Sequence, residues 1–155
     1  MREPLAESHI PAAQALMDLR SSIEQLTRPP RVLIVDDRQE DRILLRLEIQ
    51  KIINAQIFEA IDSKDAVEMA KHTNFDTIFL DMVMPGTSGL EFLNQITCKN
   101  IVVLVTGFDA HSPDVLNALK LGAVTVLTKP VSAEALRAVF GNPRYVTGSR
   151  TPIIT

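Results

Sequence analysis

Cysteine is nearly absent from this chain of 155 residues, because Cys98 is the only one. A lone cysteine cannot form an intramolecular disulfide, and it leaves no cysteine cluster for zinc. Histidine is also scarce: His9, His72 and His111 are far apart in the sequence, and we assign no metal partner to any of them. We therefore assign these four residues no chemical role.

The chain also lacks an excess of positive charge and any long apolar run. Lys and Arg number 16 against 19 Asp and Glu, a formal net charge of -3, which argues against a nucleic-acid surface. No apolar stretch approaches the roughly 18 residues of a membrane span, and the N-terminus has no signal-peptide core. With 46% hydrophobic residues, the chain can bury one sizeable core. We expect a soluble cytoplasmic protein of one domain with terminal extensions.

Short apolar runs alternate with amphipathic stretches, a pattern typical of βαβ units rather than hairpins. This alternation predicts an α/β protein with a parallel five-stranded sheet. The strands are expected at residues 31–35, 56–60, 77–80, 101–105 and 124–128.

A helix is expected after each strand. The first follows Asp36-Asp37 and is expected to turn Ile43, Leu44 and Leu47 inward. Residues that commonly cap helix N-termini precede the other four: Asp62, Ser88, Ser112 and Ser132.

Four of the predicted strands end in polar residues. These are the pair Asp36-Asp37, Asp81, the pair Thr106-Gly107, and Lys129 before Pro130. Each alone has an ordinary explanation, such as a helix cap, a turn or a surface lysine. Ligands of open parallel sheets bind at the carboxyl ends of the strands, so the joint placement predicts one polar crevice.

With these motifs in this order, residues 31–140 resemble the receiver domain of bacterial two-component response regulators. The resemblance implies a doubly wound, flavodoxin-like fold. It divides the chain into an N-terminal helical extension and linker (1–30), the receiver (31–140) and a tail (141–155).

The resemblance also implies a chemistry. Asp81 would accept a phosphoryl group from a histidine kinase or a histidine phosphotransfer protein, and Thr106, Gly107 and Lys129 would contact the phosphoryl oxygens. Clustered carboxylates call for a hard cation such as Mg²⁺. By resemblance Asp37, Asp81 and the backbone carbonyl of Val83 bind it, and Asp36 holds a metal-bound water. A cis peptide before Pro130 is also implied.

Three positions depart from the family. Val126 stands where an aromatic residue is common, so switching should follow another route, such as movement of residues 106–112 and the helix after them. Val83 and Phe108, two residues after Asp81 and Thr106, are apolar. Neither can orient an attacking water, so slow loss of the phosphoryl group is expected.

The N-terminal extension carries a heptad-like seam over residues 5–26. Its members are Leu5, His9, Ala12, Leu16, Leu19, Ile23 and Leu26. Two interpretations stay open: a helix packed on its own receiver, or a helix that pairs two chains in a homodimer. The tail is expected to be disordered or to add a strand to a neighbour, and as it is too short for a DNA-binding module we expect a stand-alone regulator.

We expect a phosphorylation-dependent signalling protein that acts by contact with an unidentified output protein. A phosphate shuttle or sink in a phosphorelay is the alternative. A metal-dependent phosphohydrolase is disfavoured, because the nearest such family has a second acid where Val83 stands.

Overall fold

The computed structural model describes residues 11–85, 87–96, 101–107 and 109–142. Their centre is a parallel five-stranded sheet in the order β2-β1-β3-β6-β7. The strands are β1 (Arg31–Val35), β2 (Gln56–Ala60), β3 (Thr77–Asp81), β6 (Ile101–Thr106) and β7 (Thr125–Thr128). The predicted α/β fold is confirmed, with strand bounds within one residue of those expected.

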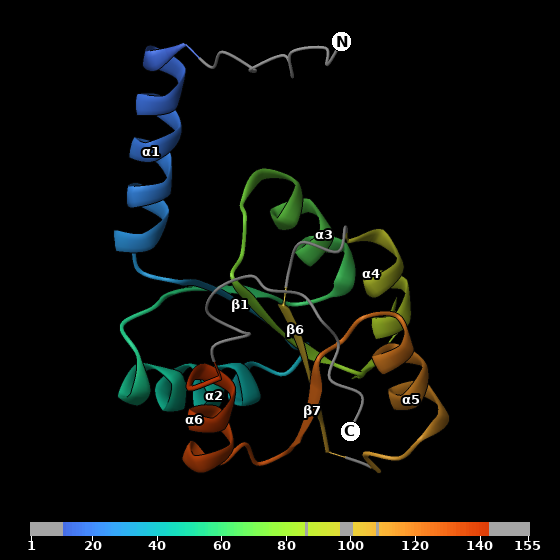
Figure 1. The fold of residues 1–155 in the computed structure, drawn as a ribbon. Helices are drawn as coiled ribbons and strands as arrows, with labels where there is room; N and C mark the ends of the chain where they lie inside the picture. The colour runs from blue at the N-terminus through green and yellow to red at the C-terminus, as the bar shows by residue number, and fades with distance from the viewer. Residues whose placement is uncertain (1–10, 86, 97–100, 108, 143–155) are drawn as a thin grey trace, which may run out of the picture.

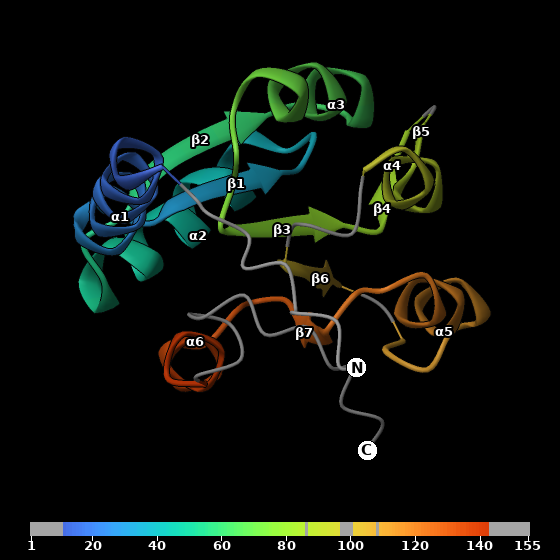
Figure 2. The same ribbon diagram turned by 45° about the horizontal axis from the view of Figure 1, so that its top comes forward.

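Helices cover both faces of the sheet, as Figures 1 and 2 show. One face carries α3 (Ser63–His72), α4 (Gly89–Gln95) and α5 (Pro113–Lys120), and the other carries α2 (Gln39–Ile52) and α6 (Ala133–Phe140). Successive strand residues point to opposite faces, so Leu33 and Val35 join the first core cluster while Val32 and Ile34 join the second. Two buried faces explain why the strands are continuous apolar runs.

Side-chain caps fix the start of three helices. Asp62 accepts a hydrogen bond from the backbone N–H of Asp65, and Ser132 accepts one from Ala135. Ser112 accepts one from Val115, ahead of Pro113. These caps were predicted. The fourth predicted cap, Ser88, directly precedes α4 as the last residue of β5 (Thr87–Ser88).

The predicted inner face of α2 was wrong. Leu44 and Leu47 are 59% and 47% exposed, whereas Leu45 and Ile49 are buried and Ile43 is half-buried. The cause is that α2 has apolar residues on more than one side, so that helical spacing alone fits two inner faces. The i, i+4 pair Leu45 and Ile49 is the one that meets the sheet.

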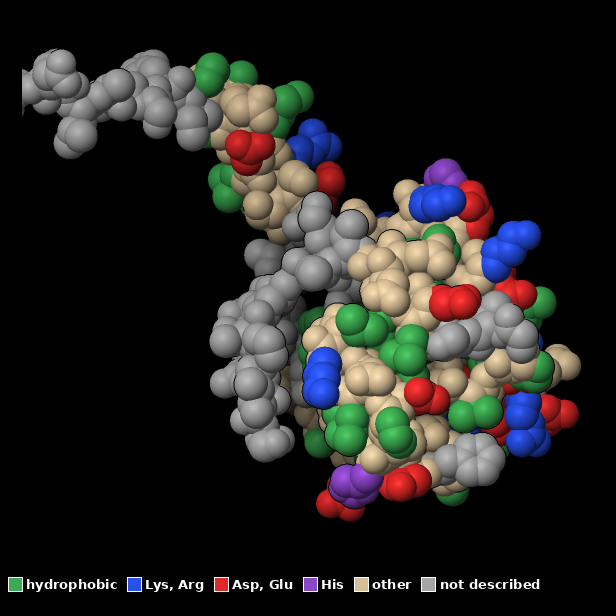
Figure 3. All heavy atoms as spheres, turned by 90° about the vertical axis from the view of Figure 1, so that its right-hand side faces the viewer, with side chains coloured by type: hydrophobic (Ala, Val, Ile, Leu, Met, Phe, Trp, Pro, Cys, Tyr) green, Lys and Arg blue, Asp and Glu red, His purple; other side chains and the backbone are tan. Residues whose placement is uncertain are grey.

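The helix α1 (Ala12–Thr27) stands away from the domain (Figures 1 and 3). Every residue from 11 to 24 is exposed, including Leu16, Leu19 and Ile23. Over residues 11–24 the helix therefore makes no buried contact with the described part of its receiver, which disfavours the first of the two interpretations of its apolar seam. Leu5 and His9 of that seam, like the tail from residue 143, lie outside the described residues.

The linker after α1 is anchored to the receiver. Arg28 forms a two-pronged ion pair with Asp76, with nitrogen–oxygen distances of 2.8 and 3.1 Å. Asp76 also accepts the backbone N–H of Arg31 at 2.7 Å. Bidentate arginine–carboxylate pairs hold a defined geometry, so this contact fixes the point where α1 leaves the domain.

Candidate functional site: an acidic crevice at the strand ends

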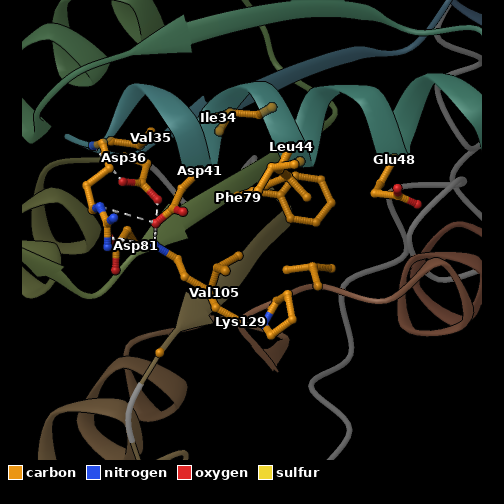
Figure 4. A pocket seen from close by; sticks show the side chains of 15 residues that line it. Ile34, Val35, Asp36, Asp41, Leu44, Glu48, Phe79, Asp81, Val105 and Lys129 are labelled. Carbon is orange, nitrogen blue, oxygen red and sulfur yellow. Dashed lines mark hydrogen bonds and ion pairs between the residues drawn. The ribbon is translucent and has the colours of Figure 1, made fainter.

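The carboxylates of Asp36, Asp37 and Asp81 meet at the C-terminal edge of the sheet. Figure 4 shows Asp36 and Asp81. Asp36 follows β1 and Asp81 ends β3, and each is 5% exposed, whereas Asp37 is exposed. Each of the three acids offers an oxygen, and these oxygens all lie within 4.8 Å of one another. β1 and β3 are adjacent parallel strands in register, which is why their ends coincide.

Backbone hydrogen bonds orient the two buried acids. The N–H of Arg38 donates to Oδ1 of Asp36 at 2.9 Å, and the N–H of Val83 donates to Oδ1 of Asp81 at 3.0 Å. In each acid the other oxygen, Oδ2, faces Lys129. The two carboxylates are thus held with one oxygen toward the chain and one toward the crevice.

Lys129 enters the crevice from the end of β7. Its Nζ lies 2.7 Å from Asp36 Oδ2, 2.9 Å from Asp41 Oδ2 and 3.1 Å from Asp81 Oδ2. The side chain is 20% exposed. The backbone N–H of Lys129 donates to the carbonyl of Thr106 at 2.8 Å, and the peptide bond between Lys129 and Pro130 is cis, as expected.

Burial and charge act differently on the acid and the lysine. Burial raises the pKa of Asp81, and the Val83 N–H and Lys129 offset part of that rise. For Lys129, burial alone would lower the pKa, but hydrogen bonds to Asp36 and Asp41 and the charge of Asp81 outweigh it and raise the pKa. The lysine is therefore firmly cationic.

Thr106 and Gly107 complete the edge. Thr106 ends β6 and is 1% exposed, and β6 lies between β3 and β7 in the sheet. A Cβ built at Gly107 would meet no atom within 4 Å. The space on the Cβ side of Gly107 is therefore open, and Gly107 lines the cavity beside Asp81 and Lys129.

The three positions that depart from the family pattern lie in different parts of the chain. Val83 begins the short strand β4 (Val83–Met84), which pairs antiparallel with β5, and is 54% exposed. Val126 is half-buried and packs on the core under α3, α4 and α5. Phe108 lies outside the described residues.

Asp41 is a site residue that the sequence analysis missed. It lies in the first turn of α2, where acids are common because they favour the helix dipole, so its type raised no suspicion. The helix begins three residues after Asp36, which turns Asp41 back toward the crevice. Asp37 lies before the N-cap Arg38, outside the helix, so no helical spacing links the two acids, and the residue pattern carries no signal that places Asp41 at the site.

The crevice opens into a cavity of about 450 Å³ between α2 and the segment after β7. Asp36, Asp41, Asp81 and Lys129 lie at one end (Figure 4). Leu44, Phe79 and Val105 line its middle, and Glu48 lies farther from the charged end.

The three acids fit a hard divalent cation. Mg²⁺ prefers carboxylate oxygens and keeps several waters, which suits a cluster with one exposed member, Asp37. Repulsion among three close carboxylates would be relieved by such an ion. Asp36, Asp37 and Asp81 are the side chains that would hold it.

Comparison with known structures gives the same fold. The receiver domain of a putative LuxO repressor protein from Vibrio parahaemolyticus superposes with a TM-score of 0.66 at 26% identity, over 77% of this chain and 91% of that one. The chemotaxis protein CheY4 of Vibrio cholerae gives 0.64 at 26% identity, over 74% and 98%. A CheY-like receiver domain from Methanospirillum hungatei gives 0.69 over 79% and 98%, at 18% identity.

Sequence comparison agrees. A protein-glutamate methylesterase/protein-glutamine glutaminase of Paramagnetospirillum magneticum is 32% identical over 128 residues, 80% of this chain and 36% of the relative. The nitrate/nitrite response regulator NarL of Escherichia coli is 28% identical over 137 residues, 81% of this chain and 62% of the relative. The chain thus spans less than two thirds of these relatives. The family model of the response regulator receiver domain matches residues 32–140, and the chain therefore belongs to the response regulator receiver domain family.

Proposed function

We propose that the protein accepts a phosphoryl group on Asp81 and signals, in that state, by contact with another protein. The observation that carries the proposal is the convergence of buried Asp81, its acidic neighbours and Lys129 at one sheet edge. In the transfer, an oxygen of Asp81 bonds to phosphorus while the phosphorus–nitrogen bond of a phosphohistidine donor breaks. The imidazole leaves and takes up a proton, and Asp81 becomes an acyl phosphate.

The other residues have supporting roles in this proposal. Lys129 donates from its ammonium, Thr106 from its hydroxyl and Gly107 from its N–H to the phosphoryl oxygens. Asp36, Asp37, Asp81 and the Val83 carbonyl serve the metal site, Asp36 through a bound water. Mg²⁺, when bound, supplies neutralisation of the incoming negative charge. The donor is a histidine kinase or a histidine phosphotransfer protein, and the setting is the cytoplasm.

Intact-mass measurement tests the phosphoacceptor. With Mg²⁺ and a small phosphoramidate donor, the protein should gain one phosphoryl group. Asp81→Asn and removal of Mg²⁺ by chelation should each abolish the gain. Asp114→Asn, a change of the same kind at an exposed helix start, should leave it intact. Labelling that persists in Asp81→Asn would contradict the assignment.

Two other functions make different predictions. A phosphate shuttle would pass the group from Asp81 back to a histidine phosphotransfer protein, so phosphate would move between purified proteins without an output partner. A phosphohydrolase would turn over an aryl phosphate many times. Val83 is exposed and apolar, and its side chain can neither donate nor accept a proton. It therefore favours neither the shuttle nor the phosphohydrolase over signalling.

We further propose that α1 pairs with α1 of a second copy of this chain. Leu16, Leu19 and Ile23 form one stripe with Ala12, all are exposed, and the anchored linker points the helix away from its own receiver. The spacing of three and four residues is that of a two-helix seam. Within the described residues nothing covers this stripe, and burying it between two copies removes it from water.

Light scattering across a concentration series tests the pairing. Leu19→Asp places a charge in the stripe and should lower the mass toward that of a monomer. Ser21→Asp places the same charge on the opposite side of the helix and should not. A parent protein that is monomeric at the highest concentration, or two variants with equal masses, would rule the dimer out.

A further inference from the structure

Lys129 contacts three carboxylates that come from different parts of the fold. Its Nζ contacts Asp36, Asp41 and Asp81 at 2.7, 2.9 and 3.1 Å, respectively. Asp36 and Asp81 belong to the cluster whose oxygens lie within 4.8 Å of one another, together with Asp37. Asp41 does not belong to that cluster, and it comes from α2 rather than from a strand end.

A cation in the acidic cluster and the ammonium of Lys129 would claim the same oxygens. Like charges at such separations repel by several kcal/mol at an effective dielectric constant near 20. The ammonium must therefore move away from Asp36 and Asp81 when a divalent ion binds. Only 20% of the lysine side chain is exposed, so most of it already lies within the crevice.

Asp41 offers the ammonium a partner that the cation does not use. Its carboxylate already lies within hydrogen-bond distance of Nζ, and its side chain is 21% exposed. The other base beside it, Arg38, is more distant, at 3.9 Å, and its side chain is 67% exposed. Asp41 is thus engaged mainly with Lys129 (Figure 4).

We propose that Asp41 is a positioning residue that holds the Lys129 ammonium when Asp36 and Asp81 turn to the metal. The lysine then stays inside the crevice, paired with Asp41, while the cation binds. This inference rests on Mg²⁺ binding in the proposed function. It assigns to α2 a role in the site that the strand ends alone do not supply.

A double-mutant cycle on Mg²⁺ affinity tests the role, with calorimetric titration of the full chain as the measurement. In the parent, Asp41→Asn should weaken Mg²⁺ binding about fivefold, because the ammonium loses its partner and stays on the metal's carboxylates. In Lys129→Met no ammonium competes, and Asp41→Asn should change the affinity less than about twofold. Lys129→Met alone should tighten Mg²⁺ binding.

Glu40→Gln is the matched control. Glu40 is the preceding residue, carries the same charge and is exposed, so it reports the general loss of one negative charge near the site. Its effect should be below about twofold in both backgrounds. If Lys129→Met does not fold, Lys129→Gln takes its place in the cycle.

The outcomes separate this inference from the proposed function. Coupling between Asp41 and Lys129, with none between Glu40 and Lys129, supports the role. Equal loss from Asp41→Asn in both backgrounds, or a loss no larger than that of Glu40→Gln, overturns it while Mg²⁺ binding stands. A parent that binds no Mg²⁺ overturns the metal site and this inference together.

Discussion

At the scale of single residues, the crevice carries more negative charge than its lysine can balance. Asp36, Asp41 and Asp81 all contact Lys129, and Asp37 lies beside them. Close carboxylates that share one ammonium repel one another, and removing any one of them relieves the others. The charge cluster therefore lowers the stability of the metal-free protein, and the proposed cation would relieve that repulsion.

Asp81→Asn should stabilise the metal-free protein at pH 7. Burial raises the pKa of Asp81 on folding, so the ionised carboxylate costs stability above its folded pKa and costs none below its unfolded pKa of about 3.9. The neutral amide escapes that cost. We expect a gain on the order of 1 kcal/mol, about 4 °C in Tm, that disappears as the pH falls toward 4.

Thermal unfolding with a chelator present measures this gain. Asp114→Asn removes an exposed acid at a helix start, and it should be neutral or slightly destabilising. Adding Mg²⁺ should shrink the advantage of Asp81→Asn, because the cation stabilises only a protein that binds it. A destabilised Asp81→Asn at pH 7 would show that its contact with Lys129 outweighs burial.

Val83 should lengthen the lifetime of the acyl phosphate. Its N–H is 3.0 Å from Asp81 Oδ1, and its side chain is exposed and apolar, so it gives an attacking water no hydrogen-bond partner. Val83→Asn combined with Phe108→Glu should hasten phosphate loss about tenfold. Decay after donor removal, at fixed Mg²⁺ and pH, measures it. No change in the double variant would mean that these side chains do not limit water access.

The residues of the site differ in how far the sequence could place them. Asp36, Asp81, Thr106 and Lys129 each follow or end an apolar run, and the register of parallel strands brings such ends together. Asp41 follows no such run. Its position depends on the direction in which α2 leaves the sheet, which a pattern of residue types does not encode.

At the scale of elements, the strands were predictable and the inner face of α2 was not. A strand that is buried on both faces is apolar at every position, so a continuous apolar run is enough to identify it. A helix buries only one side. Because α2 has apolar residues on several sides, its buried side is decided by packing against β1 and α6. The pair β4 and β5 was missed because two-residue strands have no periodicity.

The orientation of α2 predicts opposite results for two neighbouring substitutions. Ile49 is fully buried between α2 and the sheet, so Ile49→Ala should cost about 3 kcal/mol of unfolding free energy. Leu47 is 47% exposed, and Leu47→Ala should change stability by less than about 0.5 kcal/mol. Chemical denaturation of both variants gives the comparison. Similar losses would mean that α2 turns Leu47 inward, as its spacing first suggested.

At the scale of the whole molecule, the two ends of the sheet have separate tasks. The strand C-termini form the crevice, while β1 begins beside the linker that carries α1. Among the helices in the described part of the chain, none is both long and apolar enough to cross a membrane. The apolar stripe of α1 is exposed, and the linker that follows it is held to the receiver by Arg28.

The ion pair between Arg28 and Asp76 should set the direction of α1. It joins the end of α1 to the turn before β3, across 48 residues of sequence. Arg28→Ala removes both prongs and leaves the linker only its backbone contacts, so α1 should sample a wider range of angles. Spin labels at Gln14→Cys and Lys64→Cys, both exposed, in a Cys98→Ser background, report the distance between helix and domain.

Labelled protein diluted into an excess of unlabelled protein confines the measured distances to pairs within one chain. We expect a narrow distribution in the parent and a clearly broader one in Arg28→Ala. Arg20→Ala is the matched control, because Arg20 pairs only with Glu24 on its own helix and its side chain is 83% exposed. Equally narrow distributions in all three proteins would show that Pro29 and Pro30 alone hold the helix, since proline restricts the chain without any ion pair.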